Sequence, residues 1–147
     1  MTAADFRVEP FRPEHLTLLA LQPHQQPMRA FIQSPGYAEM LATTDAFTAF
    51  VGDRAVACGG VMTIWEGRGT AWALLAGEIG GDVMRRVHFA AKRYFDASTL
   101  RRIEATCDVD FEQGHRWLSL LGFTLETHIM RGYRPDGGDE SMYVRTR

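Results

Sequence analysis

The sequence has no long apolar run, and its charges nearly cancel. The 16 basic and 18 acidic residues give a formal net charge of −2, and they are mixed along the chain rather than gathered in blocks. A strong basic excess would favour nucleic acid or an anionic membrane as a partner, so we expect neither. No run approaches the roughly 18 apolar residues that a membrane-spanning helix needs. The start, MTAADFRVEP, lacks the basic and apolar regions of a signal peptide, so we expect a cytoplasmic protein.

Cysteine is also scarce, and most familiar catalytic motifs are missing. The two cysteines, Cys58 and Cys107, lie far apart without metal-ligand spacing. They are predicted to be buried thiols in a reducing compartment. The sequence contains no P-loop, no G-x-S-x-G, no H-E-x-x-H and no cysteine–histidine cluster. We therefore predict no metal site.

What the sequence does contain fits one domain over residues 1–147, with ordinary hydrophobic (46%) and charged (23%) fractions. Alternating or continuous apolar runs predict strands, and apolar residues at helical spacing predict helices. The predicted strands are 5–11, two runs within 46–65 joined at Gly52-Asp53, 68–79, 101–109, 123–133 and 141–147. The predicted helices begin at Pro13 and at Ser34–Pro35, with Ser34 as cap, and cover 82–97, capped by Asp82, and 111–122, ended by Gly122. Residues 21–29 are predicted to form a loop because of Pro23 and Pro27.

This order predicts an α/β or α+β fold, with one mixed sheet and helices on both of its faces. The strand–helix–strand connection through residues 82–97 should be a right-handed parallel crossover.

The element order resembles that of the GNAT superfamily of N-acetyltransferases. The start FRVEPFRPEHL (residues 6–16) resembles the family's I-R-x-x-x-x-x-D opening, and WLSLLGF (117–123) resembles its x-Y-x-x-x-G-F helix end. The resemblance covers nearly the whole chain. It implies a mostly antiparallel sheet of six to seven strands and transfer of an acetyl group from acetyl-CoA to an amine.

A narrower resemblance concerns WALLAGEI (72–79), MRRVHFAAKRYFD (84–96) and HRWLSLLGF (115–123). These segments are similar to a small GNAT-like protein of short-tailed bacteriophages, described as an internal virion or assembly protein. This resemblance implies a non-catalytic protein of virion assembly or host interaction, in the host cytoplasm.

In the GNAT family, the fourth strand and the next helix bind acetyl-CoA, and a Q/R-x-x-G-x-G/A loop holds the pyrophosphate on backbone N–H groups. This sequence has AGEIGGDVMRR there, so the loop is degenerate. The resemblance places the cofactor on Leu75, Ala76, Gly80, Gly81, Val83, Met84, Arg85 and Arg86. Asp82 would repel phosphate at that position. Alternatively, Gly80-Gly81 is only a turn from strand to helix.

The family's general acid is usually a tyrosine four residues before the glycine of G-F. Leu118 stands there, and leucine cannot donate a proton. The neighbouring Ser119 could replace the tyrosine as general acid by acting through a water. Alternatively, Ser119 is only a residue on the helix surface.

A base must accept the proton of the amine, often through a water. Glu78, Asp108 and Asp110 lie at the carboxyl ends of the fourth and fifth strands, although Asp110 could equally cap the next helix. His88 and His115 lie on the adjoining helices, and Cys107 could be a nucleophile beside His115 or a core thiol. We predict that Glu78, Asp108 and Ser119 are the catalytic residues.

Two hypotheses remain. An acetyltransferase predicts an open cleft between the fourth and fifth strands, whereas a non-catalytic protein with another protein as partner predicts that Trp72, Met84 or Asp82 fills it.

The acceptor amine would bind in a pocket built from the loop 22–37 and the last hairpin. Candidates by position are Gln22, His24, Gln25, Gln26 and Tyr37. A basic stripe of Arg85, Arg86, Lys92, Arg93, Arg101 and Arg102 is either a solvated helix face or a docking surface. A monomer and a homodimer are both compatible with the sequence.

Overall fold

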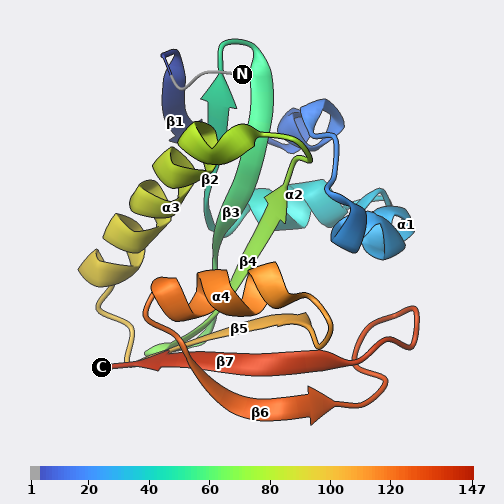
Figure 1. Ribbon diagram of the computed structural model, residues 1–147, viewed down its shortest axis with the longest axis vertical. Coiled ribbons are helices and arrows are strands. Elements are labelled where there is room, and N and C mark those ends of the chain that lie inside the picture. The colour runs from blue at the N-terminus through green and yellow to red at the C-terminus, as the bar shows by residue number, and fades with distance from the viewer. Residues whose placement is uncertain (1–3) are drawn as a thin grey trace.

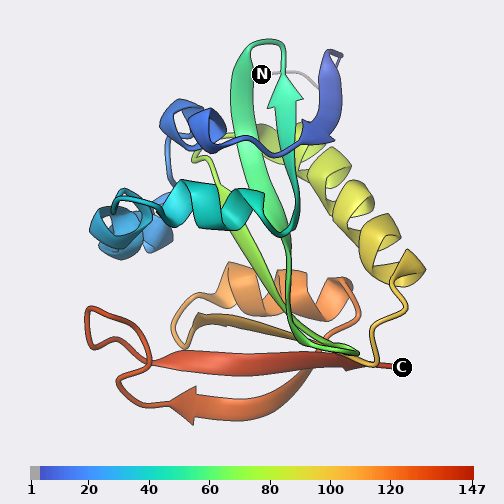
Figure 2. The ribbon, with the colours of Figure 1, turned by 180° about the vertical axis from the view of Figure 1, so that it is seen from behind.

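The computed structural model describes residues 4–147 as one seven-stranded sheet with helices on both faces (Figures 1 and 2). The strand order is β1-β2-β3-β4-β5-β7-β6, and every neighbouring pair is antiparallel except β4–β5. The strands are β1 (Phe6–Pro10), β2 (Asp45–Val51), β3 (Arg54–Trp65), β4 (Arg68–Leu75), β5 (Arg102–Asp108), β6 (Thr124–Met130) and β7 (Glu140–Thr146). The mixed, mostly antiparallel sheet predicted from the sequence is confirmed.

The helices differ more from the prediction. They are the 3-10 helices η1 (Pro13–Leu18) and η2 (Pro23–Met28), then α1 (Arg29–Ile32), α2 (Tyr37–Ala42), α3 (Gly80–Ala97) and α4 (Glu112–Leu120). The segment predicted as a loop is therefore helical, because Pro23 occupies a first helical turn, where a missing N–H costs nothing. None of the described helices is long and apolar enough to cross a membrane.

Three predicted helix caps are wrong. Ser34 bonds back to the carbonyl of Phe31, and α2 begins only after Gly36, whose φ is 83°. Helix α3 begins at Gly80, so Asp82 lies within its first turn and makes no capping hydrogen bond. Asp110 donates its N–H to the Asp108 carboxylate instead of capping α4. The helix therefore begins before the predicted cap at Asp82 and after it at Ser34 and Asp110.

The two faces of the sheet carry different helices. Helices α3 and α4 lie on one face, and η1, η2, α1 and α2 lie on the other (Figures 1 and 2). Val83 and Val87 bury the apolar side of α3 against the half of the sheet that contains β1–β4. A second cluster, which includes Ile103 and Phe123, lies between β5, β7 and the α4 segment. Trp117 packs against both clusters and joins the two halves of the core.

Strands β4 and β5 are paired over only three positions. Arg68, Gly69 and Thr70 pair with Arg102, Ile103 and Glu104, although β4 continues to Leu75 and β5 to Asp108. Beyond this short contact the two strands diverge, and Figure 1 shows β4 rising while β5 runs across. The sheet therefore opens into a V between its two halves.

An ion-pair cluster joins the strands at the closed end of this V. The Glu104 carboxylate, only 8% exposed, accepts hydrogen bonds from Arg68 Nε at 2.8 Å and Nη2 at 2.9 Å. It also accepts one from Arg102 Nε at 2.7 Å. These hydrogen bonds from the two guanidinium groups outweigh the opposing effect of burial and lower the pKa of Glu104 from 4.5 to about 2. The cluster links β4 to β5 where backbone pairing ends.

Replacing Glu104 by glutamine should lower the free energy of unfolding by about 2 kcal/mol at pH 7, because the two half-buried arginines lose their shared, buried counterion. The folded-state pKa of Glu104 lies below its unfolded value, so its contribution is present above about pH 4.5 and is lost as the pH falls toward 2. Urea unfolding at pH 7 and pH 3 measures both effects. The matched control is Glu126→Gln, because Glu126 is more exposed and also pairs with Arg102. An equal loss in the two variants contradicts this account.

Candidate active site

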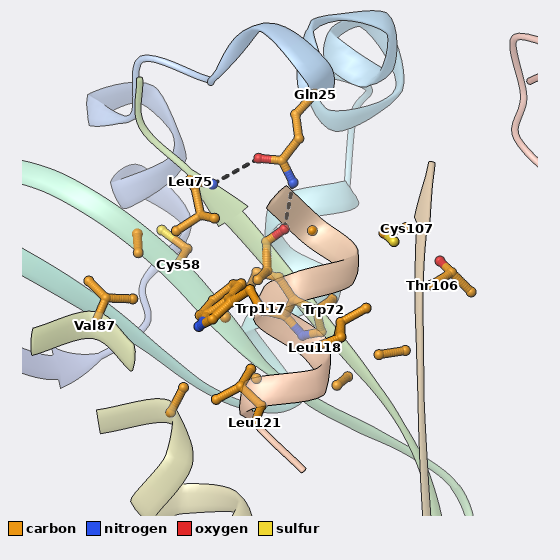
Figure 3. A pocket seen from close by; sticks show the side chains of 18 of the residues that line it. Gln25, Cys58, Trp72, Leu75, Val87, Thr106, Cys107, Trp117, Leu118 and Leu121 are labelled. Carbon is orange, nitrogen blue, oxygen red and sulfur yellow. Dashed lines mark hydrogen bonds between the residues drawn. The ribbon is translucent and has the colours of Figure 1, made fainter. Parts of the chain in front are cut away.

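The V between β4 and β5 encloses a pocket of about 300 Å³ (Figure 3). It remains open because small residues line it where strands and helices would otherwise fill the space. These residues are Gly59, Gly60, Ala71, Ala73, Ala90, Ala91, Ala105 and Gly114. Larger apolar side chains close the rest of the wall, among them Trp72, Trp117 and Leu118. Met84 and Asp82 do not line the pocket, so the cleft is not filled by them.

Strand β5 presents different chemistry to the two faces of the sheet. Ala105 packs in the core cluster beside α4, and Cys107 follows it on the same face because strand side chains alternate. Thr106 and Asp108 therefore face the side of η1, η2 and α2. One side of the V is thus apolar, and the other is polar at its mouth.

The thiols of the pocket are held in their neutral form. Burial raises the pKa of Cys58 to about 11, although a contact with Thr48 partly opposes it. Burial raises the pKa of Cys107 to about 12, and the neighbouring charges of Glu140 and Asp108 add to the shift. A nucleophilic cysteine needs a thiolate near neutral pH, so neither residue is suited to that role.

The edge of β4 that faces the V carries polar backbone groups, and Gln25 from η2 bonds to two of them. Gln25 Nε2 donates to the carbonyl of Ala73 at 2.7 Å, and its Oε1 accepts the N–H of Leu75 at 2.8 Å. Figure 3 shows the Gln25 amide reaching from η2 to β4. The neighbouring His24 stacks on Phe111, which follows β5, with ring centroids 4.2 Å apart. Helix η2 therefore spans the mouth of the V from one arm to the other.

A charged cluster lies at the β5 side of this mouth. Arg134 forms ion pairs with Asp108, with Asp136 at 3.0 Å and with Glu140 at 3.2 Å. Asp108 and Glu140 are register partners on β5 and β7, so their side chains share one face. Both carboxylates and Arg134 line the pocket.

The pKa values of the Asp108 and Glu140 carboxylates are shifted in opposite directions. Burial alone would raise the pKa of Asp108, but hydrogen bonds from Arg134 and from the Asp110 N–H lower it below its usual value. Burial dominates at Glu140 and raises its pKa, while Arg134 and Thr106 offset only part of the shift. Glu140 is therefore the carboxylate of this pocket that binds a proton more readily than usual.

Solved structures with a similar fold include acetyltransferases. An acetyltransferase of the GNAT family from Streptococcus pneumoniae matches with a TM-score of 0.69 at 10% identity, over 97% of this chain and 99% of that one. A ribosomal-protein alanine acetyltransferase from Vibrio fischeri matches at 0.65 and 16% identity, over 97% and 93%. The RimL ribosomal-protein acetyltransferase, solved with coenzyme A, matches at 0.67 and 12%, over 99% and 96%. This chain has the GNAT fold. No protein-family model and no curated protein sequence matches it.

Within the GNAT fold, the predicted cofactor residues lie where β4 passes into α3. Leu75 is on the pocket wall, while Ala76, Val83 and Met84 pack in the core. At the start of α3, a Cβ added at Gly81 would meet nothing within 4 Å, so the backbone there is open to a ligand. Arg85 and Arg86 are exposed nearby, and so is Asp82. Leu118 is on the pocket wall at the family's acid position and offers no proton.

Of the three predicted catalytic residues, the structure brings only Asp108 to the pocket. Glu78 is exposed in the loop before α3, with a φ of 56°, and it does not line the pocket. Ser119 is exposed on α4 and donates its hydroxyl proton to the carbonyl of His115 at 3.1 Å. Neither position favours a role at the reacting atoms.

Both histidines near the predicted site have structural partners. His115 contacts the Tyr143 hydroxyl at 2.7 Å through Nδ1 and the carbonyl of Val109 at 3.0 Å through Nε2. His88 accepts the indole N–H of Trp117 at 3.2 Å. Neither histidine lines the pocket.

The predicted basic stripe is not continuous. Lys92 forms an ion pair with Asp96, and Arg102 forms ion pairs with Glu104 and Glu126. Arg85 lies over the ring of Phe89, 5.6 Å from its centroid.

Sequence reasoning missed the charged pair that matters most here. Of the candidates for the acceptor, Gln22, His24 and Gln25 do line the pocket, whereas Gln26 and Tyr37 do not. Arg134 and Glu140 were not predicted, because they flank a glycine-rich turn that reads only as a hairpin loop. Their one signal is Glu140 at the start of a strand that pairs with the end of β5.

The cysteines should react with a thiol reagent far more slowly in the folded protein than in the unfolded chain. At their raised pKa values the thiolate fraction falls by at least about 100-fold relative to a free cysteine. Labelling with Ellman's reagent at pH 8, with and without urea, measures the two rates. A Cys107→Ala variant assigns the signal, and fast labelling of Cys107 in the folded protein contradicts the assignment of a neutral thiol.

Proposed function

We propose that this protein is an acyltransferase that moves an acetyl group from acetyl-CoA to an amine. The observation that carries the proposal is the V itself, with an apolar pocket along the stretch of β4 that no longer pairs with β5. From Leu75 on the pocket wall the chain continues to the N-terminus of α3 at Gly80. Bound acetyl-CoA supplies a thioester whose C–S bond breaks as the amine nitrogen bonds to the carbonyl carbon. Its amide-bearing arm suits the backbone donors and acceptors of β4.

The residues present fit this group at the arm and less well at the phosphates. The edge of β4 carries the Ala73 carbonyl and the Leu75 N–H, which are bonded to the Gln25 amide in this structure. Among the buried side-chain nitrogen and oxygen atoms of residues 4–147, the indole nitrogen of Trp72 is the one without a hydrogen-bond partner. The open N-terminus at Gly81, with Arg85 and Arg86, would hold phosphate. Asp82 opposes it, so binding should be weaker than with the family's usual loop.

Glu140 is our candidate for the proton acceptor. Its pKa is raised toward the working range of a base, and it lines the pocket on the face opposite α4. Asp108 has its pKa lowered and is paired with Arg134, so it holds Arg134 and presents negative charge to a cationic amine. Leu118 leaves the departing sulfur without a side-chain acid, so the sulfur would leave as a thiolate or take its proton from water.

Calorimetric titration with acetyl-CoA tests the binding part of the proposal. We expect micromolar affinity, and Arg85→Glu or Arg86→Glu should weaken it about tenfold or more by removing a charge-assisted contact with phosphate. Arg93→Glu, on an exposed position further along α3, is the matched control and should leave the affinity unchanged. No binding at millimolar acetyl-CoA would sink the enzymatic proposal.

Glu140→Gln should reduce the turnover number about 100-fold or more if Glu140 accepts the proton, since a positioned base contributes this much. Because the base must be deprotonated, the wild-type rate should fall as the pH drops through the raised pKa of Glu140, and the variant should lose that limb of the profile. Asp136→Asn is the control, because Asp136 also pairs with Arg134 but does not line the pocket. An unchanged rate and profile in Glu140→Gln refutes this role.

The alternative is a GNAT-shaped protein without catalysis that acts in phage virion assembly or host interaction. Two observations favour it: Leu118 at the position of the acid, and the Gln25 amide already bonded to the edge of β4. This alternative predicts that neither acetyl-CoA nor coenzyme A binds at millimolar concentration.

A further inference from the structure

Gln25 completes a line of contacts along the end of β4. Backbone groups make the first of them: Gly77 N–H donates to the carbonyl of Ala20 at 3.0 Å, and Gln22 N–H donates to the carbonyl of Leu75 at 2.8 Å. Between them, Leu21 forms an isolated antiparallel bridge with Ala76. At this point the chain turns away into η2. The side chain of Gln25 then satisfies the next donor and acceptor of the strand.

A glutamine side chain suits this place because its amide, like a peptide bond, carries both a carbonyl acceptor and an N–H donor. Inside the V, β4 has lost β5 as a partner, and unpaired backbone groups near a pocket are costly. Gln25 thus does for Ala73 and Leu75 what a neighbouring strand, or an amide of a bound ligand, would do.

The contact between the Gln25 side chain and β4 can break without disturbing the surrounding backbone. Gln25 is half-buried, and the two η2 prolines, Pro23 and Pro27, have no N–H to lose. Its remaining side-chain partner is Gln22, whose Nε2 donates to Gln25 Oε1 at 3.2 Å. Rotation of the Gln25 side chain therefore breaks three hydrogen bonds of the side chain and leaves the backbone bonds of residues 20–22 to β4 in place.

We infer that Gln25 is an internal competitor for the β4 edge, which an amide-bearing chain must displace before it can bind in the V. The inference rests on the proposed function, since coenzyme A is such a chain. The apparent affinity of a ligand falls with the fraction of molecules in the open state. The two hydrogen bonds from Gln25 to β4 keep most molecules in the closed state, in which the Gln25 amide occupies the strand edge. Removing the Gln25 amide should therefore strengthen binding about tenfold.

The test compares Gln25→Ala with Gln26→Ala and with the wild type, titrated calorimetrically with coenzyme A. Gln26 is the matched control: it is the next residue of η2, and its amide bonds to the carbonyl of Leu21 instead of β4. We expect coenzyme A to bind about tenfold more tightly to Gln25→Ala than to the wild type or to Gln26→Ala.

The other outcomes are distinct. Equal affinities in all three proteins, or weaker binding by Gln25→Ala, overturn the competitor role while leaving the proposed function standing. No binding by any of them overturns both.

Amide hydrogen exchange without ligand gives an independent measure of the contact between Gln25 and β4. The Leu75 N–H should be protected in the wild type and in Gln26→Ala, and should exchange at least about tenfold faster in Gln25→Ala. Unchanged protection of Leu75 also overturns the inference.

Discussion

The short parallel contact between β4 and β5 is the constraint on which the rest of this molecule depends. Three paired positions and the Glu104 cluster hold the strands together at one end. Past Thr70 the strands separate, and each must satisfy its inner edge in another way. β7 pairs with β5 along its whole length and carries it away from β4. The pocket is therefore a consequence of how the sheet is joined, and not a hollow between loops.

The separation of the strands determines which chemistry meets in the pocket. Small side chains on β4, α3 and β5 leave it hollow, while α4 closes the apolar side with Leu118 and Trp117. The polar side is formed by the end of β5 and the start of β7, where burial and Arg134 act in opposite directions on two neighbouring carboxylates. Helix η2 spans the open end. A strand edge with backbone donors and acceptors, an apolar chamber and a carboxylate of raised pKa thus lie within one cleft.

The sequence predicted the fold well because its strands and long helices carry strong local patterns. The hairpin at Gly52-Asp53, the helix up to Ala97 and the helix end at Gly122 could each be found from apolar spacing and glycine. Segments with weaker patterns were missed, such as the helical turns of residues 23–32. The site was predicted only in part. Asp108 ends a recognisable strand, but Glu140 and Gln25 gain their positions from strand pairing and from a tertiary contact that no local spacing reveals.

The central claim is that the gap between β4 and β5 is a binding cleft for an acyl-CoA. The most direct test is an amide NMR titration of the isotopically labelled protein with coenzyme A. The account predicts that shifts concentrate at Ala73 and Leu75 on β4, at Gly81 at the start of α3, and at Ala105 across the cleft. Shifts confined to other surfaces, or none at millimolar ligand, would contradict it.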